Sequence, residues 1–135
     1  MLEFDNKGFL IPNDVIPSSL QELEQFFVLE MPTGQRKHHF DSYLNYSKEL
    51  KKLCKDIELT QWIDGSFVTK KENPNDIDLV TFLDFESTKS IHHLLESFGK
   101  GSSKTIYEVD AYIVYTYSID DKRYFLYQSD STLDT

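Results

Sequence analysis

Two aspartates, Asp76 and Asp78, stand two residues apart at the start of an apolar run in this sequence. Side chains two residues apart on a strand point to the same face, so the two carboxylates are expected to lie together while Ile77 and Leu79 point to the other face. Adjacent carboxylates repel each other, and a cation between them relieves that repulsion. Oxygen ligands set this closely suit a hard cation such as Mg²⁺, which proteins usually share with the phosphates of a substrate. The pair therefore predicts a site for a divalent cation.

A Gly-Ser pair, Gly65-Ser66, precedes these aspartates at the end of another apolar segment. Glycine lets a phosphate approach the backbone closely, and the serine offers that phosphate a hydroxyl and an N–H. Lys70 and Lys71 follow in the connecting loop and supply positive charge. A third carboxylate, Asp110, lies within an apolar segment, where an unpaired carboxylate would be costly to bury. Three carboxylates around two divalent ions form the clamp used for phosphoryl and nucleotidyl transfer.

The Gly-Ser pair, the pair Asp76 and Asp78, and Asp110 stand in an order that resembles the nucleotidyltransferase superfamily that includes DNA polymerase beta. The resemblance is closest to the small, stand-alone bacterial members, the minimal nucleotidyltransferases. The stretch 62–78, together with 4–10, also looks like an uncharacterised family of bacterial and phage proteins with the same motif. This narrower likeness extends over most of the chain.

The resemblance implies that Asp76 and Asp78 bind two metal ions, and that Asp110 binds the catalytic one and helps to deprotonate the incoming hydroxyl. It also implies that Ser66 holds the terminal phosphates of a nucleoside triphosphate such as ATP. Minimal members often carry an arginine after the Gly-Ser pair, and in this chain one of the two lysines that follow stands in its place. We therefore expect a Mg²⁺-dependent enzyme, with Mn²⁺ as a substitute ion. It would transfer a nucleoside monophosphate from the triphosphate to a hydroxyl of a protein, an RNA or a small molecule.

Two other functions fit parts of the same pattern. The fold could serve as an interaction module with weak or no catalysis, for example one component of a toxin–antitoxin pair or of a phage-defence system, since minimal members often work beside a cognate partner protein. Nucleic-acid binding without chemistry fits least, because a formal net charge of −9 opposes non-specific binding to DNA or RNA. The residues alone leave catalysis and partner binding open.

The elements that must position these residues follow from turn signals and hydrophobic periodicity. The run Asp5–Gly8 predicts a turn between two short extended segments. Ser19 and Glu22 have the spacing of a capping box and predict the start of a first helix. A second helix is expected at 36–57, with an apolar stripe that includes Cys54 as a small core residue.

The rest of the chain alternates apolar runs with turn signals. The run that follows Asp78 is almost continuously apolar, which predicts a central strand covered on both faces. Asp110 lies in the next expected strand. The remaining elements are expected in the order strand 59–64, strand 77–83, helix 87–98, strand 105–117 and strand 123–128.

Three other features are predicted to be structural. The pairs His38-His39 and His92-His93 lack the spacing of a zinc site on a helix, so we expect ordinary surface or partly buried histidines. Asp64, just before the Gly-Ser pair, is expected to face solvent or to cap the turn.

Together these elements predict an α/β (α+β) domain of the nucleotidyltransferase type, a small mixed β-sheet flanked by helices with an N-terminal helical arm. We expect a single domain overall, with the arm and short helix at 1–35, the nucleotidyltransferase-like part at 36–128 and a flexible acidic tail at 129–135. A hydrophobic content of 39% with 14% aromatic residues supports a folded core. One cysteine rules out an intramolecular disulfide, and no segment approaches the ~18 apolar residues that span a bilayer. We therefore expect a cytoplasmic protein that does not act on a membrane.

Overall fold

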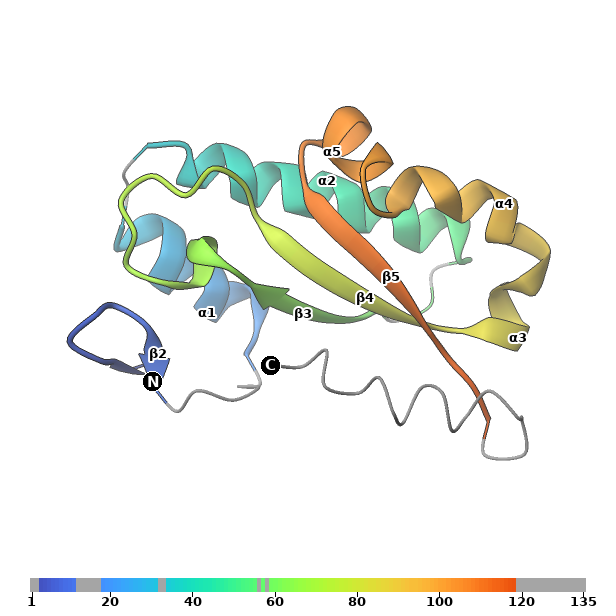
Figure 1. Ribbon diagram of the computed structural model, residues 1–135, viewed down its shortest axis with the longest axis horizontal. Coiled ribbons are helices and arrows are strands. Elements are labelled where there is room, and N and C mark those ends of the chain that lie inside the picture. Colours follow the sequence, from blue (N-terminus) through green and yellow to red (C-terminus); the bar gives the residue numbers. More distant parts are fainter. Residues whose placement is uncertain (1–2, 12–17, 32–33, 56, 58, 119–135) are drawn as a thin grey trace.

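The computed structural model describes residues 3–11, 18–31, 34–55, 57 and 59–118 of the chain. Within them, a three-stranded mixed sheet packs against helices, and a short hairpin lies near the N-terminus (Figure 1). The α+β class with a small mixed sheet flanked by helices is thereby confirmed. The strand expected at 123–128 and the acidic tail lie outside the described residues.

The N-terminal hairpin consists of β1 (Glu3–Phe4) and β2 (Leu10–Ile11), which pair in antiparallel fashion. The Asp5 carboxylate closes the turn between them, because it accepts hydrogen bonds from the N–H groups of Lys7 at 2.8 Å and Phe9 at 3.0 Å. An Asp side chain that binds nearby backbone N–H groups is typical of such turns. The predicted turn is therefore confirmed.

The first helix begins where the capping box predicted. The Ser19 hydroxyl accepts from the N–H of Glu22, whose carboxylate accepts from the N–H of Ser19. The α-helix α1 (Leu20–Glu24) continues into the π-helical segment η1 (Gln25–Leu29). Phe27 of this segment lies in the core, where 1% of it is exposed.

Helix α2 (Arg36–Leu53) lies behind the sheet in Figure 1 and supplies much of the core. Tyr46 is fully buried, and its hydroxyl donates to the carbonyl oxygen of Phe98 at 2.6 Å. The helix ends four residues earlier than expected, because Lys55 adopts φ 60° and turns the chain away. Cys54, the last residue before that turn, is buried, as its place on the apolar stripe predicted.

The sheet has the order β3-β4-β5, so the strand that follows the aspartate pair is central, as expected. Strand β3 (Thr60–Asp64) pairs with β4 (Asp78–Asp84) in antiparallel fashion, and β4 pairs with β5 (Asp110–Thr116) in parallel. In the described residues the two faces of β4 are covered to different extents: Leu79 is buried against the helices, whereas Val80 on the opposite face is only half-buried. On this outer face apolar side chains pack on one another along the sheet, as Trp62 does on Phe82.

The connection from β4 to β5 is a series of short helical pieces rather than the single helix expected at 87–98. It starts earlier than predicted, because the Asp84 carboxylate caps the first piece by accepting from the N–H of Ser87 at 2.9 Å. The pieces are α3 (Phe85–Thr88), η3 (Lys89–Ile91), α4 (His92–Leu95), η4 (Glu96–Phe98) and α5 (Ser102–Tyr107).

Helix α5 corrects the strand expected at 105–117, which in the structure starts only at Asp110. The buried Ser103 fixes the helix against the following strand, since its hydroxyl accepts from the N–H of Ala111 at 3.1 Å. Glu108 then adopts φ 61° and ends the helix. In the described ranges, no helix combines the length and apolar composition needed to cross a bilayer.

Candidate functional site

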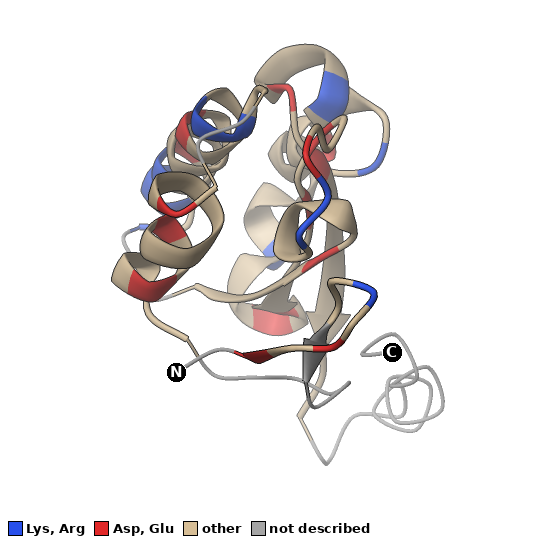
Figure 2. Ribbon diagram, turned by 90° about the vertical axis from the view of Figure 1, so that its left-hand side faces the viewer, with Lys and Arg blue, Asp and Glu red and all other residues tan. Residues whose placement is uncertain are grey.

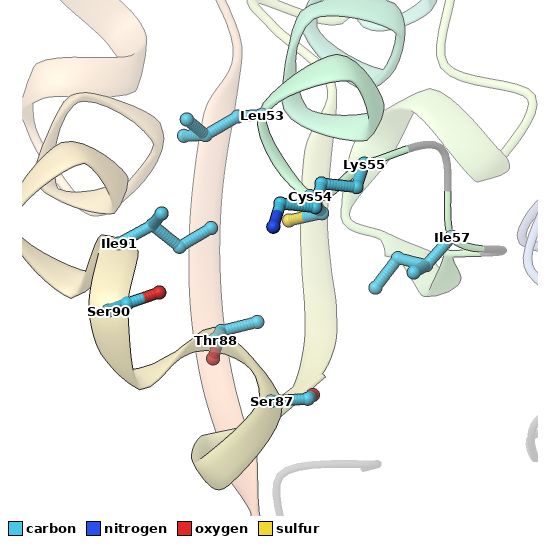
Figure 3. Close-up of a pocket in the computed structure, with 8 residues that line it drawn as sticks. All are labelled: Leu53, Cys54, Lys55, Ile57, Ser87, Thr88, Ser90 and Ile91. Atoms are coloured by element: carbon cyan, nitrogen blue, oxygen red, sulfur yellow. The ribbon is translucent and has the colours of Figure 1, made fainter.

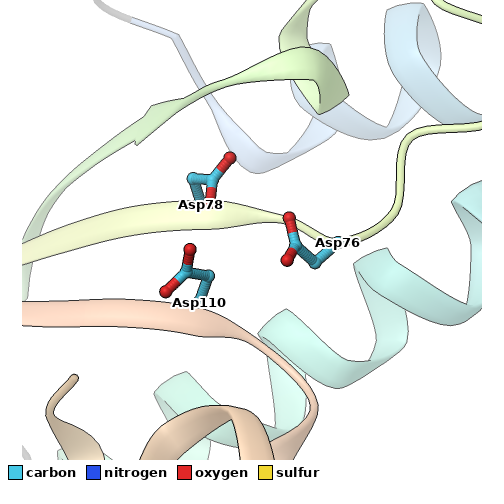
Figure 4. Close-up of side chains that lie close together, drawn as sticks. All are labelled: Asp76, Asp78 and Asp110. Carbon is cyan, nitrogen blue, oxygen red and sulfur yellow. The ribbon is translucent and has the colours of Figure 1, made fainter. Parts of the chain in front are cut away.

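Asp76, Asp78 and Asp110 lie together at one end of the sheet (Figure 4). One carboxylate oxygen of each lies within 4.8 Å of those of the other two. The parallel register of β4 and β5 places Asp78 beside Asp110, and the N–H of Asp110 donates to the carbonyl oxygen of Ile77 at 3.0 Å. The three aspartates that the sequence analysis singled out thus form one cluster, which we call the carboxylate cluster.

Asp76 precedes β4 rather than belonging to it, since the strand begins at Asp78. The alternation of side chains still holds across this boundary: Ile77 is fully buried, and the aspartates on either side of it both reach the cluster. Asp64 ends β3 opposite Asp78 and is exposed, as expected, but it is not one of the three clustered carboxylates.

Gly65 lies directly against the cluster and has a conformation that only glycine adopts readily. Its φ is +76° and its ψ is −164°, and a Cβ atom at this position would lie 1.9 Å from Oδ2 of Asp78. The missing side chain therefore makes room for the carboxylate of Asp78, a role that the sequence analysis did not foresee beside the expected approach of a phosphate. Ser66 follows at the first position of the 3-10 helix η2 (Ser66–Val68), at the same edge of the sheet.

Full ionisation of the carboxylate cluster is unfavourable. Burial raises the pKa of Asp78 to about 7, and the hydrogen bond with Asp110 and the negative charges of Asp76, Asp110 and Asp64 act in the same direction. A proton is therefore held at this site near neutral pH when no cation is bound. An all-oxygen donor set that retains a proton in this way fits a hard divalent cation, which would take the place of that proton.

Lys104 of α5 provides the positive charge at the cluster. Its Nζ lies 3.1 Å from Oδ2 of Asp76, and this contact raises the pKa of Lys104. The sequence analysis missed Lys104, because it placed this residue outside any helix, directly before the strand expected at 105–117, and no local pattern links it to the motif. Its side chain is 64% exposed, so it can move to another anion.

The two lysines singled out from the sequence are placed differently. Nζ of Lys70 lies 4.8 Å from the centre of the Phe4 ring, and the N–H of Lys70 donates to the carbonyl oxygen of Gly8 at 3.0 Å. Lys70 therefore ties the loop to the N-terminal hairpin. The carbonyl oxygen of Lys71 accepts from Arg36, and the Lys71 side chain is exposed. In the part of the chain that the structure describes, the structure joins Lys104, not Lys70 or Lys71, to the cluster by an ion pair.

A buried arginine holds the segment that connects Gly65-Ser66 to the aspartates. Arg36, in the first turn of α2, is fully buried, and burial lowers the pKa of its guanidinium. All four of its acceptors in the described residues are main-chain carbonyl oxygens, at 2.6–3.1 Å: Phe27, Phe67, Thr69 and Lys71.

His39 extends this anchor by one helical turn. It is 6% exposed, so it is more deeply placed than the surface or partly buried histidine expected, and its Nε2 lies 2.8 Å from the carbonyl oxygen of Pro74. Arg36 and His39 together fix the course of residues 67–74, which lead into Asp76. Sequence reasoning missed both, because their partners are backbone atoms that no side-chain pattern specifies.

A pocket lies away from the cluster, between the end of α2 and the α3–η3 segment (Figure 3). Its volume is about 80 Å³, too small for a nucleotide, since ligand pockets usually measure some 300–1,000 Å³. It adjoins α3, which follows the opposite end of β4 from Asp78. This pocket is therefore separate from the site at the cluster.

Charged residues are interspersed over the described surface, and Figure 2 shows lysines and arginines spread over several segments in this view. The ion pair Lys37–Asp41, at 2.7 Å, is typical of this pattern because both partners are exposed on one helix. This spread of positive charge is consistent with the formal net charge of −9.

The comparisons with known proteins give a family but no activity. A family model described as "Family of unknown function (DUF6932)" matches residues 2–132. No match was found among curated proteins or among solved structures.

Proposed function

The chain belongs to DUF6932, a family of unknown function, and from the site itself we propose that it is a metal-dependent nucleotidyltransferase. The observation that carries the proposal is the carboxylate cluster, three aspartates with ligand atoms within 4.8 Å of one another. Its support is the order of the residues, in which Gly65-Ser66 precedes the cluster as in the superfamily that the sequence resembles. The contact between Gly65 and Asp78 adds a physical reason for that order.

The reaction assigned to the site is an in-line displacement at phosphorus. A hydroxyl oxygen of the acceptor forms a bond to the α-phosphorus of a nucleoside triphosphate. The bond from that phosphorus to the bridging oxygen of the β-phosphate breaks, and pyrophosphate leaves. The hydroxyl proton passes to the carboxylate of Asp110, which is only partly exposed to water.

The residues at the cluster divide the remaining tasks. Asp76, Asp78 and Asp110 would hold Mg²⁺ or Mn²⁺, which when bound neutralises phosphate charge and favours displacement. The N–H and hydroxyl of Ser66 bind the terminal phosphates at the sheet edge. Lys104, released from Asp76 when the carboxylates bind a cation, pairs with phosphate oxygens instead.

Binding is tested first, by calorimetry with each of the four nucleoside triphosphates in the presence of Mg²⁺. Asp76→Asn and Asp78→Asn should each abolish Mg²⁺-dependent binding, because each removes a ligand charge. Asp64→Asn is the matched control, since Asp64 stands on the same face one strand away but outside the cluster. Absence of binding to all four nucleotides in the wild-type chain would exclude the proposed function.

Group transfer is tested second, with triphosphates labelled at the α- or the γ-phosphate and a cell lysate as the source of acceptor. Transfer of the α label alone supports nucleotidyl transfer, whereas transfer of the γ label would indicate a kinase. Binding without transfer of either label would favour the alternative from the sequence, an interaction module with weak or no catalysis.

A further inference from the structure

The carboxylate cluster lies on the face of the sheet that points away from the buried core, and this face continues beyond it. Leu79 and Thr81 point into the core, so Asp78 and Val80 lie together on the outer face. The register then fixes the next row of side chains across the three strands: Trp62 of β3 lies opposite Val80, and Tyr112 of β5 lies beside it. We call Trp62, Val80 and Tyr112 the aromatic row.

The aromatic row presents two ring systems on either side of a smaller side chain. Tyr112 is 38% exposed, and Trp62 and Val80 are half-buried. The Trp62 ring packs against Phe82, the next residue after Val80 on the same face of β4, with the two ring centres 4.6 Å apart and steeply inclined. Adjacent strands lie ~4.8 Å apart, so the backbones of β3 and β5, which carry Trp62 and Tyr112, are roughly 10 Å apart. Val80 of β4 lies between the two rings.

Positive charge borders this row on the side of β5. Nζ of Lys100 lies 5.9 Å from the centre of the Tyr112 ring, and Lys104 contacts Asp76 at the cluster. Both lysines belong to the segment that leads into β5. A ligand that combines a flat apolar ring with negatively charged groups would therefore match both parts of the face.

The distance between the aromatic row and the carboxylate cluster suits the base of a nucleotide. Successive residues on one face of a strand are about 6.6 Å apart, so the aromatic row lies one such step from the cluster. In a nucleotide one sugar ring separates the phosphates from the base. A nucleotide with its phosphates at the cluster can therefore place its base over Val80, between Trp62 and Tyr112.

We propose that the aromatic row, Trp62, Val80 and Tyr112, binds the base of the nucleoside triphosphate. This inference rests on the proposed function and adds where and how the nucleoside is held. Stacking on a ring face accepts any base, since every base has such a face. The row offers few hydrogen-bonding groups, so the four triphosphates should bind with affinities within about tenfold of one another, in contrast to a site that reads base edges.

The test compares Mg²⁺–ATP with Mg²⁺–tripolyphosphate, which has the phosphates but no nucleoside. Trp62 is the only tryptophan of the chain, so its fluorescence reports directly on the row. ATP should bind about tenfold or more tightly than tripolyphosphate, the gain typical of stacking one base, and should quench Trp62 more strongly.

Variants of Tyr112 locate the effect. Tyr112→Ala should reduce ATP affinity towards that of tripolyphosphate and leave tripolyphosphate binding unchanged, and Tyr112→Phe should restore the difference. Leu94→Ala serves as the matched control, because Leu94 is a similarly exposed apolar side chain (47%) on α4. Circular dichroism verifies that each variant is folded.

The outcomes separate the two proposals. Equal affinities for ATP and tripolyphosphate would overturn the base subsite and leave the phosphate site standing. A preference for ATP that survives Tyr112→Ala would place the base elsewhere and also overturn the inference. If neither ligand binds, the proposed function itself fails, and the base subsite fails with it.

Discussion

Asp78 is subject to opposing demands from folding and from the proposed chemistry. Its pKa is raised from 3.8 to about 7 by burial and by its acidic neighbours, so the native chain without a cation holds a proton that the unfolded chain releases. The stability that this proton contributes is fully present below about pH 4 and is lost as the pH rises through about 7. A bound cation must displace the same proton, so cation affinity should increase over the upper part of that range.

Asp78→Asn should therefore stabilise the protein while abolishing Mg²⁺-dependent binding. In EDTA at pH 8 we expect a gain of about 1 kcal/mol, after allowance for solvent screening, which corresponds to a rise in Tm of roughly 3 °C. At pH 5 the gain should be smaller, because Asp78 is then protonated in the native wild-type chain, and it should vanish only below about pH 4, where the unfolded chain is protonated as well. Thermal denaturation at the two pH values measures the effect, and a lower Tm for the variant at pH 8 would contradict it.

Gly65 should be intolerant of any side chain, for two reasons that can be separated. Gly65→Ala adds both an unfavourable φ and a Cβ 1.9 Å from the Asp78 carboxylate, so we expect a loss of about 2–3 kcal/mol and loss of Mg²⁺ binding. Gly101→Ala is the matched control: its φ is +83°, but nothing lies within 4 Å of the added atom. It should cost about 1–2 kcal/mol and leave Mg²⁺ binding intact.

These two variants are compared by denaturant unfolding and by calorimetry with Mg²⁺. Equal effects of both substitutions on Mg²⁺ binding would show that backbone strain alone, rather than displacement of Asp78, accounts for the role of Gly65.

At the scale of elements, helix α2 does more than cover the sheet. Its first turn carries Arg36 and His39, which bind the backbone of the segment between Gly65-Ser66 and Asp76. Burying a guanidinium is costly unless its hydrogen bonds are kept. The hydrogen bonds from Arg36 to the backbone are therefore expected to hold this segment rigidly.

Arg36→Met should destabilise the protein by about 3–5 kcal/mol. Four carbonyl oxygens would lose a charged donor, and those that stay buried would have no replacement from water. Lys37→Met is the matched control, since Lys37 is the next residue and its ion pair with Asp41 is exposed to solvent; it should leave stability almost unchanged. Urea unfolding of both variants measures the difference. Similar stabilities of the two variants would contradict an anchoring role for Arg36.

The elements that the sequence predicted best are those set by local chemistry. The Asp5 turn, the Ser19 cap and the alternation around Asp78 each depend on residues within a few positions of one another. The strand expected at 105–117 was wrong at its start. Thr105 and Ile106 favour strands by themselves, whereas contacts with β5 fix this segment as the end of helix α5. The same limit explains why Lys104 was missed at the site although Asp110, only six positions later, was found.

At the scale of the whole molecule, the net charge of −9 makes bound cations a source of stability. Mg²⁺ at ten times its dissociation constant should add about 1.4 kcal/mol and raise Tm by roughly 4 °C at pH 8. NaCl at the same ionic strength should give a smaller shift, because screening acts on all surface charges rather than on the cluster. Thermal denaturation with and without Mg²⁺ tests this, with Asp78→Asn as the variant that should not respond; an equal shift with NaCl would exclude a specific site.

The parallel pairing of β4 with β5 also determines when the site comes into existence. Asp78 and Asp110 face each other only after the whole connection 85–109 has closed, whereas β3 and β4 are joined by a much shorter segment. Contacts between distant parts of a chain tend to form late, so the carboxylates should meet near the end of folding. A newly made chain would then pass most of its folding time without this concentration of negative charge. A bound divalent cation should therefore mainly lower the unfolding rate, with little effect on the rate at which the chain folds.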